Sequence, residues 1–264
     1  MLQIKEVLLC KPSYFEVNYV INPWMKPGTV NKHLAMVQWN KLLKTLIKLK
    51  IKVNIIDQKK GFPDMVFAAD QAIFKDGIGV LSNFRFNERK GETNYYKKWF
   101  KNKKIKLNIL PKNIYFEGGG ESIWHTDNLL VGTGFRNSKN IKKHLSGIFN
   151  KKVYEIELIN PYFYHLDTCL FSLNDFIFYY PPAISEKSKR VLKKLSSKLI
   201  PITKKEVFNF AANSLSIGNF VITQKGNPKF IQKIKNLGFK PIELDLGEFM
   251  KAGGGIHCLI QPLQ

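Results

Sequence analysis

The sequence predicts an α/β fold made of five similar units arranged around a central axis. Three observations support this: a short recurring pattern, a near-constant spacing between its copies, and a helix and strand before each copy. Each copy has a small or polar residue, an apolar stretch, a tight turn and a second apolar stretch, which is typical of a β-hairpin. The four clear copies begin at Asp70, Glu121, Thr168 and Asn213, which we call anchors.

The spacing of the anchors predicts a fifth unit. The four anchors lie 51, 47 and 45 residues apart, and a further step of 45 residues reaches Cys258, the fifth anchor. A period of this length is typical of repeat architectures, in which each unit buries its apolar face against its neighbours. Five blades around an axis would bring all five anchors to the centre.

A helix and a short strand are expected before each hairpin, because apolar residues recur there first at helical spacing and then as a short run. The predicted helices are residues 31–50, 92–102, 138–149, 185–199 and 228–237, and the strands that follow them are residues 53–56, 105–110, 153–159, 199–202 and 241–244. The expected apolar stripe of the first helix is Leu34, Val37, Leu42, Leu46 and Leu49. A strand at residues 7–10 is expected to complete the last blade, so that residues 1–264 form one domain.

The composition narrows the classes of function. The net charge is +22, but only four basic residues are arginines, and the lysines are spread along helical stretches. We therefore expect a solvated lysine surface and no nucleic-acid partner. No apolar run reaches the roughly 18 residues of a membrane-spanning helix, and the N-terminus does not resemble a signal peptide, so no membrane contact is expected. Three cysteines without tight spacing predict a reducing, cytoplasmic location and no disulfide framework.

The anchors carry reactive side chains. Cys258 follows the glycine run 253–255, which lets a substrate approach the backbone closely. A thiol in this place suits a nucleophile, although the alternative is a small buried apolar residue. Buried charge is costly unless it is paired, so a charged cluster at the axis is predicted to be functional. The other polar residues at or beside the anchors are Asp70, Glu117, Glu121, His165, Asp167 and Asn213.

Seven segments together resemble one known superfamily, the guanidino-group-modifying enzymes with the five-bladed α/β propeller (pentein) fold. The segments are residues 21–25, 63–67, 88–92, 116–120, 134–136, 163–168 and 253–258, so the resemblance covers nearly the whole chain. The superfamily includes arginine deiminases, dimethylarginine dimethylaminohydrolases, arginine dihydrolases and amidinotransferases. The compact length is similar to the dimethylargininase and bacterial arginine-dihydrolase branch. The resemblance implies a cytoplasmic hydrolase of an arginine-like small molecule that uses no cofactor and no metal.

The resemblance also implies a Cys/His/acid set. Cys258 would attack the guanidinium carbon, and His165 would act as general acid and base. Glu117 would orient His165 and stabilise its charge. His257 is the rival acid–base group, but neighbours in a strand point to opposite sides, which favours His165 over the residue adjacent to Cys258.

Five further residues would hold the substrate. By resemblance, Asp70 and Asp167 would hold the guanidinium nitrogens, although Asp167 could instead cap a helix or a turn. Arg89 and Arg136 are the candidates for the substrate carboxylate because a guanidinium fork matches it bidentately; the alternative is a surface ion pair. Asn22 would contact the amine, or would form only the turn before a proline.

The residue at position 70 bears on the product. Dihydrolase relatives carry Asn where this chain has Asp70, whereas deiminases and dimethylargininases carry Asp. The expected reaction is therefore one hydrolysis through a thiouronium intermediate, giving citrulline with ammonia or methylamine. The sequence does not fix whether the substrate is methylated. It also leaves the oligomeric state open, although flat propeller faces often pair into homo-oligomers.

Four alternatives stay open. The first two are an arginine dihydrolase that gives ornithine and an amidinotransferase with an amine in place of water. The third is a ribosome-binding propeller with no enzymatic role, which a basic surface would suit. The fourth is a metalloprotein built on His165, Asp167, His257 and Cys258, although their spacing does not resemble a zinc signature.

Overall fold

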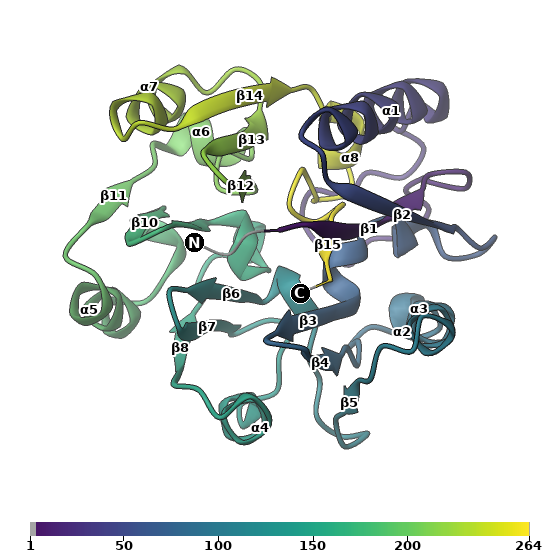
Figure 1. Cartoon of the computed structure of the whole chain (residues 1–264), viewed down its shortest axis with the longest axis horizontal. Coiled ribbons are helices and arrows are strands. Elements are labelled where there is room, and N and C mark those ends of the chain that lie inside the picture. The colour runs from purple at the N-terminus through teal and green to yellow at the C-terminus, as the bar shows by residue number, and fades with distance from the viewer. Residues whose placement is uncertain (1–3, 264) are drawn as a thin grey trace.

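The structure, a computed structural model that describes residues 4–263, is a ring of five three-stranded sheets with helices on the outside (Figure 1). This confirms the predicted α/β propeller of five repeats. Four sheets are β3 (Ala72–Lys75), β4 (Ile78–Leu81) and β5 (Asn108–Ile109); β6 (Ser122–His125), β7 (Asn128–Thr133) and β8 (Val153–Glu157); β9 (Leu170–Leu173), β10 (Phe176–Tyr179) and β11 (Leu199–Pro201); and β12 (Leu215–Ile217), β13 (Phe220–Gln224) and β14 (Lys240–Leu244).

Each of these sheets repeats one connection. The first two strands form an antiparallel hairpin, and the third strand lies parallel to the second. A parallel pair needs a long crossover, and helices on the rim of the ring supply it (Figure 1). The α-helices are α1 (Lys32–Lys48), α2 (Asn87–Lys90), α3 (Glu92–Asn102), α4 (Ile141–Phe149), α5 (Glu186–Leu195), α6 (Lys204–Phe208), α7 (Pro228–Asn236) and α8 (Gly247–Met250).

Both ends of the chain build the fifth sheet. The strand β1 (Glu6–Lys11) lies between β15 (Gln261–Pro262) and β2 (Lys52–Asp57). It pairs antiparallel with β15, where Leu8 faces Gln261, and parallel with β2, where Leu8 faces Asn54. The expectation that the N-terminal strand completes the last blade is therefore confirmed.

The hairpins owe their shape to turn residues with a left-handed backbone. Asp76 and Gly77 between β3 and β4 have φ angles of 51° and 77°. Two such residues form a turn whose twist matches that of the flanking strands. Thr126, Asn174 and Gly218 take similar angles in the equivalent turns, with φ of 53°, 53° and 57°. The repeated turn chemistry explains why the hairpins are visible in the sequence.

Two details of the predicted elements are wrong. The buried face of α1 carries Ala35, Trp39, Leu42 and Leu46, whereas Leu34 and Val37 are exposed. The expected strand at 105–110 contracts to Asn108–Ile109 because only these two residues reach β4. The short helices α2, α6 and α8 were not predicted.

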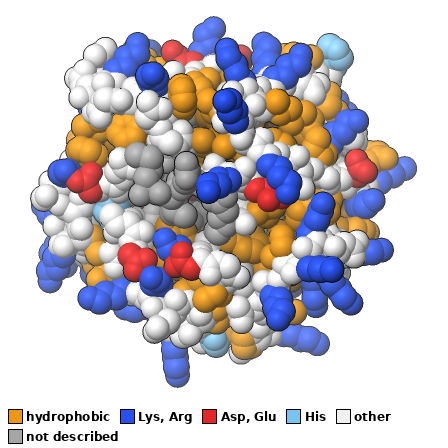
Figure 2. Space-filling view, viewed as in Figure 1, with side chains coloured by type: hydrophobic (Ala, Val, Ile, Leu, Met, Phe, Trp, Pro, Cys, Tyr) orange, Lys and Arg blue, Asp and Glu red, His pale blue; other side chains and the backbone are white. Residues whose placement is uncertain are grey.

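The surface is basic without a single basic block. Figure 2 shows Lys and Arg side chains scattered over the visible face and its rim, with apolar and uncharged groups between them. Within residues 4–263, no helix has both the length and the apolar character needed to cross a membrane.

Candidate active site

Five short segments bring the anchors to the axis, each just before an innermost strand. Three of them are tight 3₁₀ turns, at Ala68–Gln71, Gly118–Gly120 and Leu166–Thr168. Backbone hydrogen bonds join segments that are distant in sequence: the amide of Ala69 donates to the carbonyl of Cys258 at 3.0 Å, and the amide of His257 to the carbonyl of Asn213 at 3.2 Å. Main-chain contacts therefore fix the positions from which the site side chains project.

Cys258 lies buried at the axis between two polar partners. Its Sγ accepts from Asn213 Nδ2 at 3.1 Å and donates to Asp167 Oδ2 at 3.1 Å. Burial, and then the charges of Asp167 and Asp70, raise the pKa of the thiol well above its usual range. The resting group is therefore a thiol, and a cation beside the sulfur would favour the thiolate.

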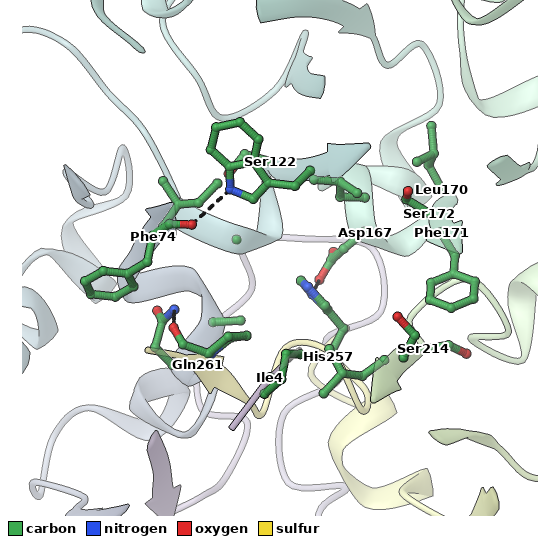
Figure 3. A pocket seen from close by; sticks show the side chains of 18 of the residues that line it. Ile4, Phe74, Ser122, Asp167, Leu170, Phe171, Ser172, Ser214, His257 and Gln261 are labelled. Atoms are coloured by element: carbon green, nitrogen blue, oxygen red, sulfur yellow. Dashed lines mark hydrogen bonds and ion pairs between the residues drawn. The ribbon is translucent and has the colours of Figure 1, made fainter. Parts of the chain in front are cut away.

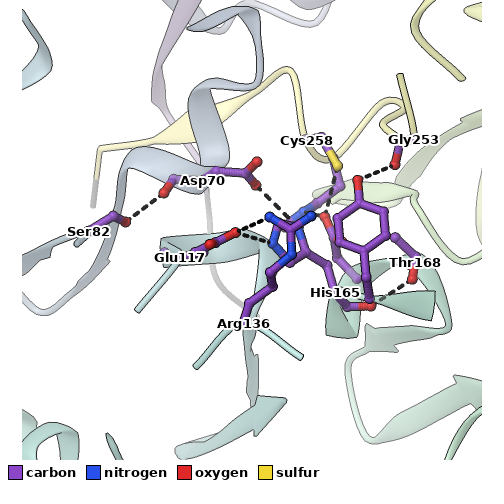
Figure 4. A network of polar contacts seen from close by, with 12 residues as sticks. Asp70, Ser82, Glu117, Arg136, His165, Thr168, Gly253 and Cys258 are labelled. Atoms are coloured by element: carbon purple, nitrogen blue, oxygen red, sulfur yellow. Dashed lines mark hydrogen bonds and ion pairs between the residues drawn. The ribbon is translucent and has the colours of Figure 1, made fainter. Parts of the chain in front are cut away.

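His165 is held from one side by a carboxylate. Its Nε2 lies 2.8 Å from Glu117 Oε2, and its Nδ1 lies 3.9 Å from Asp70 Oδ1 (Figure 4). Burial disfavours the charged imidazole, but Asp70 and Glu117 outweigh burial and raise the pKa of His165. The arrangement keeps a proton available on a ring within the same buried cluster as Cys258.

Arg136 keeps Glu117 ionised. Its Nη1 lies 3.0 Å from Glu117 Oε2, and its guanidinium lies 4.6 Å from the ring centroids of Phe86 and Tyr164. Burial raises the pKa of Glu117, but Arg136 and His165 more than offset it, so the pKa is lowered far below its usual value. Arg136 Nη2 donates to the carbonyl of Ile21 at 2.9 Å.

Arg89 forms the corresponding ion pair with Asp70, although here burial outweighs the arginine and raises the pKa of Asp70. Its Nη1 lies 2.6 Å from Asp70 Oδ2, and its Nε and Nη2 donate to Glu92 and to the carbonyl of Asp64. Arg89 and Arg136 are only 3% and 2% exposed, so a surface ion pair is wrong for both. Both arginines were expected to bind a substrate carboxylate; the structure places each against a carboxylate of the protein.

Three buried polar atoms around Cys258 lack a hydrogen-bond partner within the described chain: Asp70 Oδ1, Asp167 Oδ1 and His165 Nδ1. A buried polar atom without a partner is costly, so the two carboxylate oxygens mark where a ligand with N–H donors fits, and His165 Nδ1 marks where that ligand can exchange a proton. Gly120 makes their approach possible, because a Cβ there would come within 2.5 Å of Asp70 Oδ1 and 2.6 Å of His165 Nδ1.

The backbone at Cys258 differs from the expectation. Residues 256–259 form a turn and not a strand, with the Leu259 amide donating to the carbonyl of Gly255 at 3.3 Å. His257 and Cys258 consequently do not point to opposite sides. The Nδ1 of His257 and the Sγ of Cys258 both contact Asp167 Oδ2, at 2.9 and 3.1 Å. The reasoning from strand geometry is thus wrong, although His165 is the histidine held by Glu117.

Asn22 and Tyr164 both bind the backbone just before Cys258, at Ala252 and Gly253. Asn22 Nδ2 donates to the carbonyl of Ala252 at 3.1 Å, while its Oδ1 accepts from the amide of Trp24 at 2.9 Å. The Tyr164 hydroxyl donates to the carbonyl of Gly253 at 2.9 Å. Neither Tyr164 as a site residue nor Asn213 as a partner of the thiol was predicted from the sequence. The available signal for Tyr164 was its position next to His165, and the signal for Asn213 was its position 45 residues before Cys258.

Glu121 is a buried carboxyl with neither oxygen hydrogen-bonded to another described residue. It packs over Gly132, where a Cβ would come within 2.1 Å of Glu121 Oε2. Burial raises the pKa of Glu121 to about 8. The charge of His165 opposes this rise, and the charge of Glu117 adds to it. The group is therefore protonated at neutral pH in the folded protein.

Glu121→Gln should stabilise the protein progressively as pH rises above about 4.5, with the full effect reached above pH 8. The pKa of Glu121 is about 8 in the folded protein against an ordinary value of 4.5, so its penalty is absent below pH 4.5 and grows as pH rises towards 8. At pH 9 the variant should exceed the wild type in unfolding free energy by about 3–5 kcal/mol. Urea unfolding at pH 5 and pH 9 measures both differences; an equal difference at the two values would contradict the assignment.

No group of three or more His, Cys, Asp or Glu side chains within residues 4–263 is arranged to hold a metal ion. Cys10, Cys169 and Cys258 are all unpaired, buried thiols.

Comparisons with known proteins agree with this site. Residues 11–264 match a family model described as N,N dimethylarginine dimethylhydrolase, eukaryotic. The chain is 35% identical over 261 residues to the bifunctional arginine dihydrolase/ornithine cyclodeaminase ArgZ of Synechocystis sp.. The aligned region covers 96% of this chain but only 37% of ArgZ. The chain is 33% identical over 249 residues to the N(G),N(G)-dimethylarginine dimethylaminohydrolase of Mycobacterium tuberculosis, covering 94% of this chain and 82% of that protein.

A solved structure extends the likeness to the fold. The N-terminal domain of ArgZ, crystallised with its product, has a TM-score of 0.95 and 34% sequence identity, covering 98% of this chain and 97% of that domain. The matching part thus spans little more than a third of the bifunctional relative but nearly all of its N-terminal domain. The chain belongs to the dimethylarginine dimethylaminohydrolase family of guanidino-group-modifying pentein proteins.

Proposed function

We propose that the protein hydrolyses the guanidino group of L-arginine or methylated L-arginine to citrulline and ammonia or methylamine, with residues 1–264 acting as one domain. The observation that supports this most directly is the meeting of three unpartnered polar atoms, on Asp70, Asp167 and His165, with the thiol of Cys258. The two carboxylate oxygens suit a planar cation that has N–H donors on its edges, and His165 Nδ1 can give a proton to its leaving nitrogen. The thiol supplies the nucleophile that such a substrate needs.

The first half of the reaction forms a covalent intermediate. The guanidinium cation, held by Asp70 and Asp167, lowers the pKa of the Cys258 thiol, which loses its proton to solvent. The thiolate attacks the guanidinium carbon and forms a C–S bond. The C–N bond to the leaving amine then breaks as His165 donates a proton to that nitrogen, leaving an S-alkylthiouronium on Cys258.

The second half releases the product. Water attacks the same carbon and gives a proton to His165, which returns the imidazole to its charged form. The C–S bond breaks with its electron pair on sulfur, and the remaining hydroxyl proton passes to that sulfur. Cys258 therefore leaves as the thiol, and the carbon becomes the ureido carbonyl of citrulline. Glu117 accepts a hydrogen bond from His165 in both halves and stabilises the imidazolium.

Arg136 is the better of the two candidates for the substrate carboxylate. Its Nη2 binds only the main-chain oxygen of Ile21, a neighbour of Asn22, which we propose contacts the substrate amine. A carboxylate would replace that neutral acceptor with a charged one. Arg89 already holds Asp70, Glu92 and the carbonyl of Asp64, so in this proposal it acts chiefly by positioning Asp70.

A second candidate is a dihydrolase that converts arginine to ornithine, which the identity to the dihydrolase domain of ArgZ favours. Asp70 argues for one hydrolysis. A carboxylate has no proton to donate, so Asp70 would accept from a guanidinium but could not hold the oxygen of a neutral ureido group for a second attack.

Asp70→Asn should raise the share of ornithine. Arg89 has only donors, so it would bind the Asn carbonyl oxygen and turn the amide nitrogen into the place of Asp70 Oδ1. That nitrogen can donate to the ureido oxygen. One such hydrogen bond is worth about 1–1.5 kcal/mol, which corresponds to roughly a tenfold rise in the ratio of ornithine to citrulline. Chromatography of both amino acids at matched conversion measures the ratio, and an unchanged ratio would refute this role of Asp70.

The proposed function is tested by product analysis after incubation with L-arginine and, in parallel, with asymmetric dimethylarginine. Citrulline from either substrate supports the proposal, and the released amine identifies the substrate. Ornithine as the main product of the wild type would support the dihydrolase instead. No product from either, alone or with an added amine acceptor, would overturn the proposal and favour a binding protein.

A further inference from the structure

A cavity lies on the axis of the propeller, bounded by the innermost strands β3, β6, β9 and β12 and by β15 (Figure 3). The candidate active-site residues come from the segments before these strands, whereas the cavity wall consists largely of residues within them. Its volume is about 150 Å³. We call it the axial cavity.

Most of the axial cavity wall is apolar and aromatic. The walls include Ile73, Phe74, Ile123, Trp124, Phe171 and Leu215. Among the described residues that line it, none is a lysine or arginine. An apolar cavity of about this size can accept a molecule such as benzene, so the axial cavity has room for one small aromatic ring.

Two buried acceptors in the wall lack a donor: Asp167 Oδ1, which belongs to the candidate active site, and Gln261 Oε1. Gln261 is 2% exposed, and its Nε2 donates to the carbonyl of Pro262 at 2.9 Å. Its Oε1 has no hydrogen-bond partner among residues 4–263. A buried amide oxygen in this state costs about 1–3 kcal/mol, so a ligand that donates one hydrogen bond here would recover much of that cost.

The axial cavity is linked to Cys258 through two side chains. His257 and Asp167 both line the cavity and are joined at 2.9 Å between Nδ1 and Oδ2 (Figure 3). The same Oδ2 accepts from Cys258 Sγ at 3.1 Å. Because one oxygen serves both donors, a ligand that moves the His257 ring changes the hydrogen bond of the nucleophile.

We propose that the axial cavity binds a small uncharged aromatic molecule with one hydrogen-bond donor, and that its binding alters turnover at Cys258 through His257 and Asp167. The aromatic walls favour a ring, the lack of a basic lining residue gives no partner to an anion, and Gln261 Oε1 requires a donor. The binding site is independent of the proposed function, and only the effect on turnover rests on it.

Phenol and toluene are the matched probes, because they have similar shape and only phenol carries a donor. Binding to the full chain is measured by ligand-observed NMR, which requires no turnover. Phenol should bind the wild type about tenfold more tightly than toluene. Gln261→Leu should remove that preference and leave toluene binding unchanged, while Ser216→Phe, from β12 in the wall, should abolish binding of both.

Kinetics test the coupling. Phenol should change kcat in the wild type and leave it unchanged in Ser216→Phe. Without phenol, the kcat of Ser216→Phe should match that of the wild type, because Ser216 is outside the candidate active site. Phenol binding that survives Ser216→Phe, or no preference over toluene in the wild type, would overturn the site. Binding that leaves kcat unchanged, or inhibition competitive with substrate, would overturn the coupling. Failure of the proposed function would show instead as no turnover in any sample, with the NMR result intact.

Discussion

Cys258→Ser is expected to lower kcat by roughly 10⁵- to 10⁶-fold while leaving the fold intact. A serine hydroxyl has a much higher pKa than a thiol, so a bound guanidinium cannot convert it to the anion. The hydroxyl retains the two contacts of the thiol, accepting from Asn213 Nδ2 and donating to Asp167 Oδ2. Steady-state citrulline formation measures the loss, and thermal unfolding monitors the fold.

Cys10→Ser is the matched control. Cys10 is also a fully buried free thiol, but it lies in β1 within the apolar core between two blades. This substitution should lower stability by about 1–3 kcal/mol, because it buries a hydroxyl in an apolar place, and should leave kcat nearly unchanged. If Cys258→Ser were as active as the wild type, Cys258 would not be the nucleophile.

Glu117→Gln is expected to lower kcat by about 10⁴-fold, as when the acid of a Ser/His/Asp triad becomes an amide. The charge of Glu117 raises the pKa of His165, so its loss lowers that pKa. His165 must be protonated to release the amine, so the alkaline limb of the kcat profile should move to lower pH. Rates measured across pH report both effects.

The same substitution also tests stability, because it leaves Arg136 buried without its carboxylate. Such a loss costs about 3–5 kcal/mol in unfolding free energy. Adding Arg136→Met should recover much of the stability but only part of the shift in the pH profile, because the charge of Arg136 also lowers the pKa of His165. If the double variant regained both wild-type stability and the wild-type profile, Glu117 would act only as a structural partner of Arg136.

The fold was predictable because each repeat carries similar turn residues and the same order of apolar and polar residues. Each hairpin has turn residues that tolerate a left-handed backbone, as at Asp76 and Gly77, and the anchors keep a near-constant spacing. The apolar stripe of α1 was wrong because Leu34 and Val37 are apolar but face solvent. Apolar character alone does not reveal which face a neighbouring blade covers, since that depends on packing between distant segments.

Most members of the candidate site, and the contact of Glu117 with His165, could be predicted from the sequence, but the partners of its two arginines could not. Glycine runs and anchor positions indicated Cys258, Glu117 and His165, and the structure brings them into one cluster. That Arg136 binds Glu117, and Arg89 binds Asp70, follows only from three-dimensional distances. A sequence shows that an arginine needs an anion, but not whether the anion belongs to the protein or to a ligand.

The most direct test of the account is to stop the reaction with acid during turnover and determine the mass of the protein and of its Cys258 peptide. The account predicts a transient adduct on Cys258 with the mass of the substrate less the released amine, absent from Cys258→Ser and present in Cys10→Ser. Citrulline formation at full rate with no such adduct at any time, or with an adduct on another residue, would contradict it.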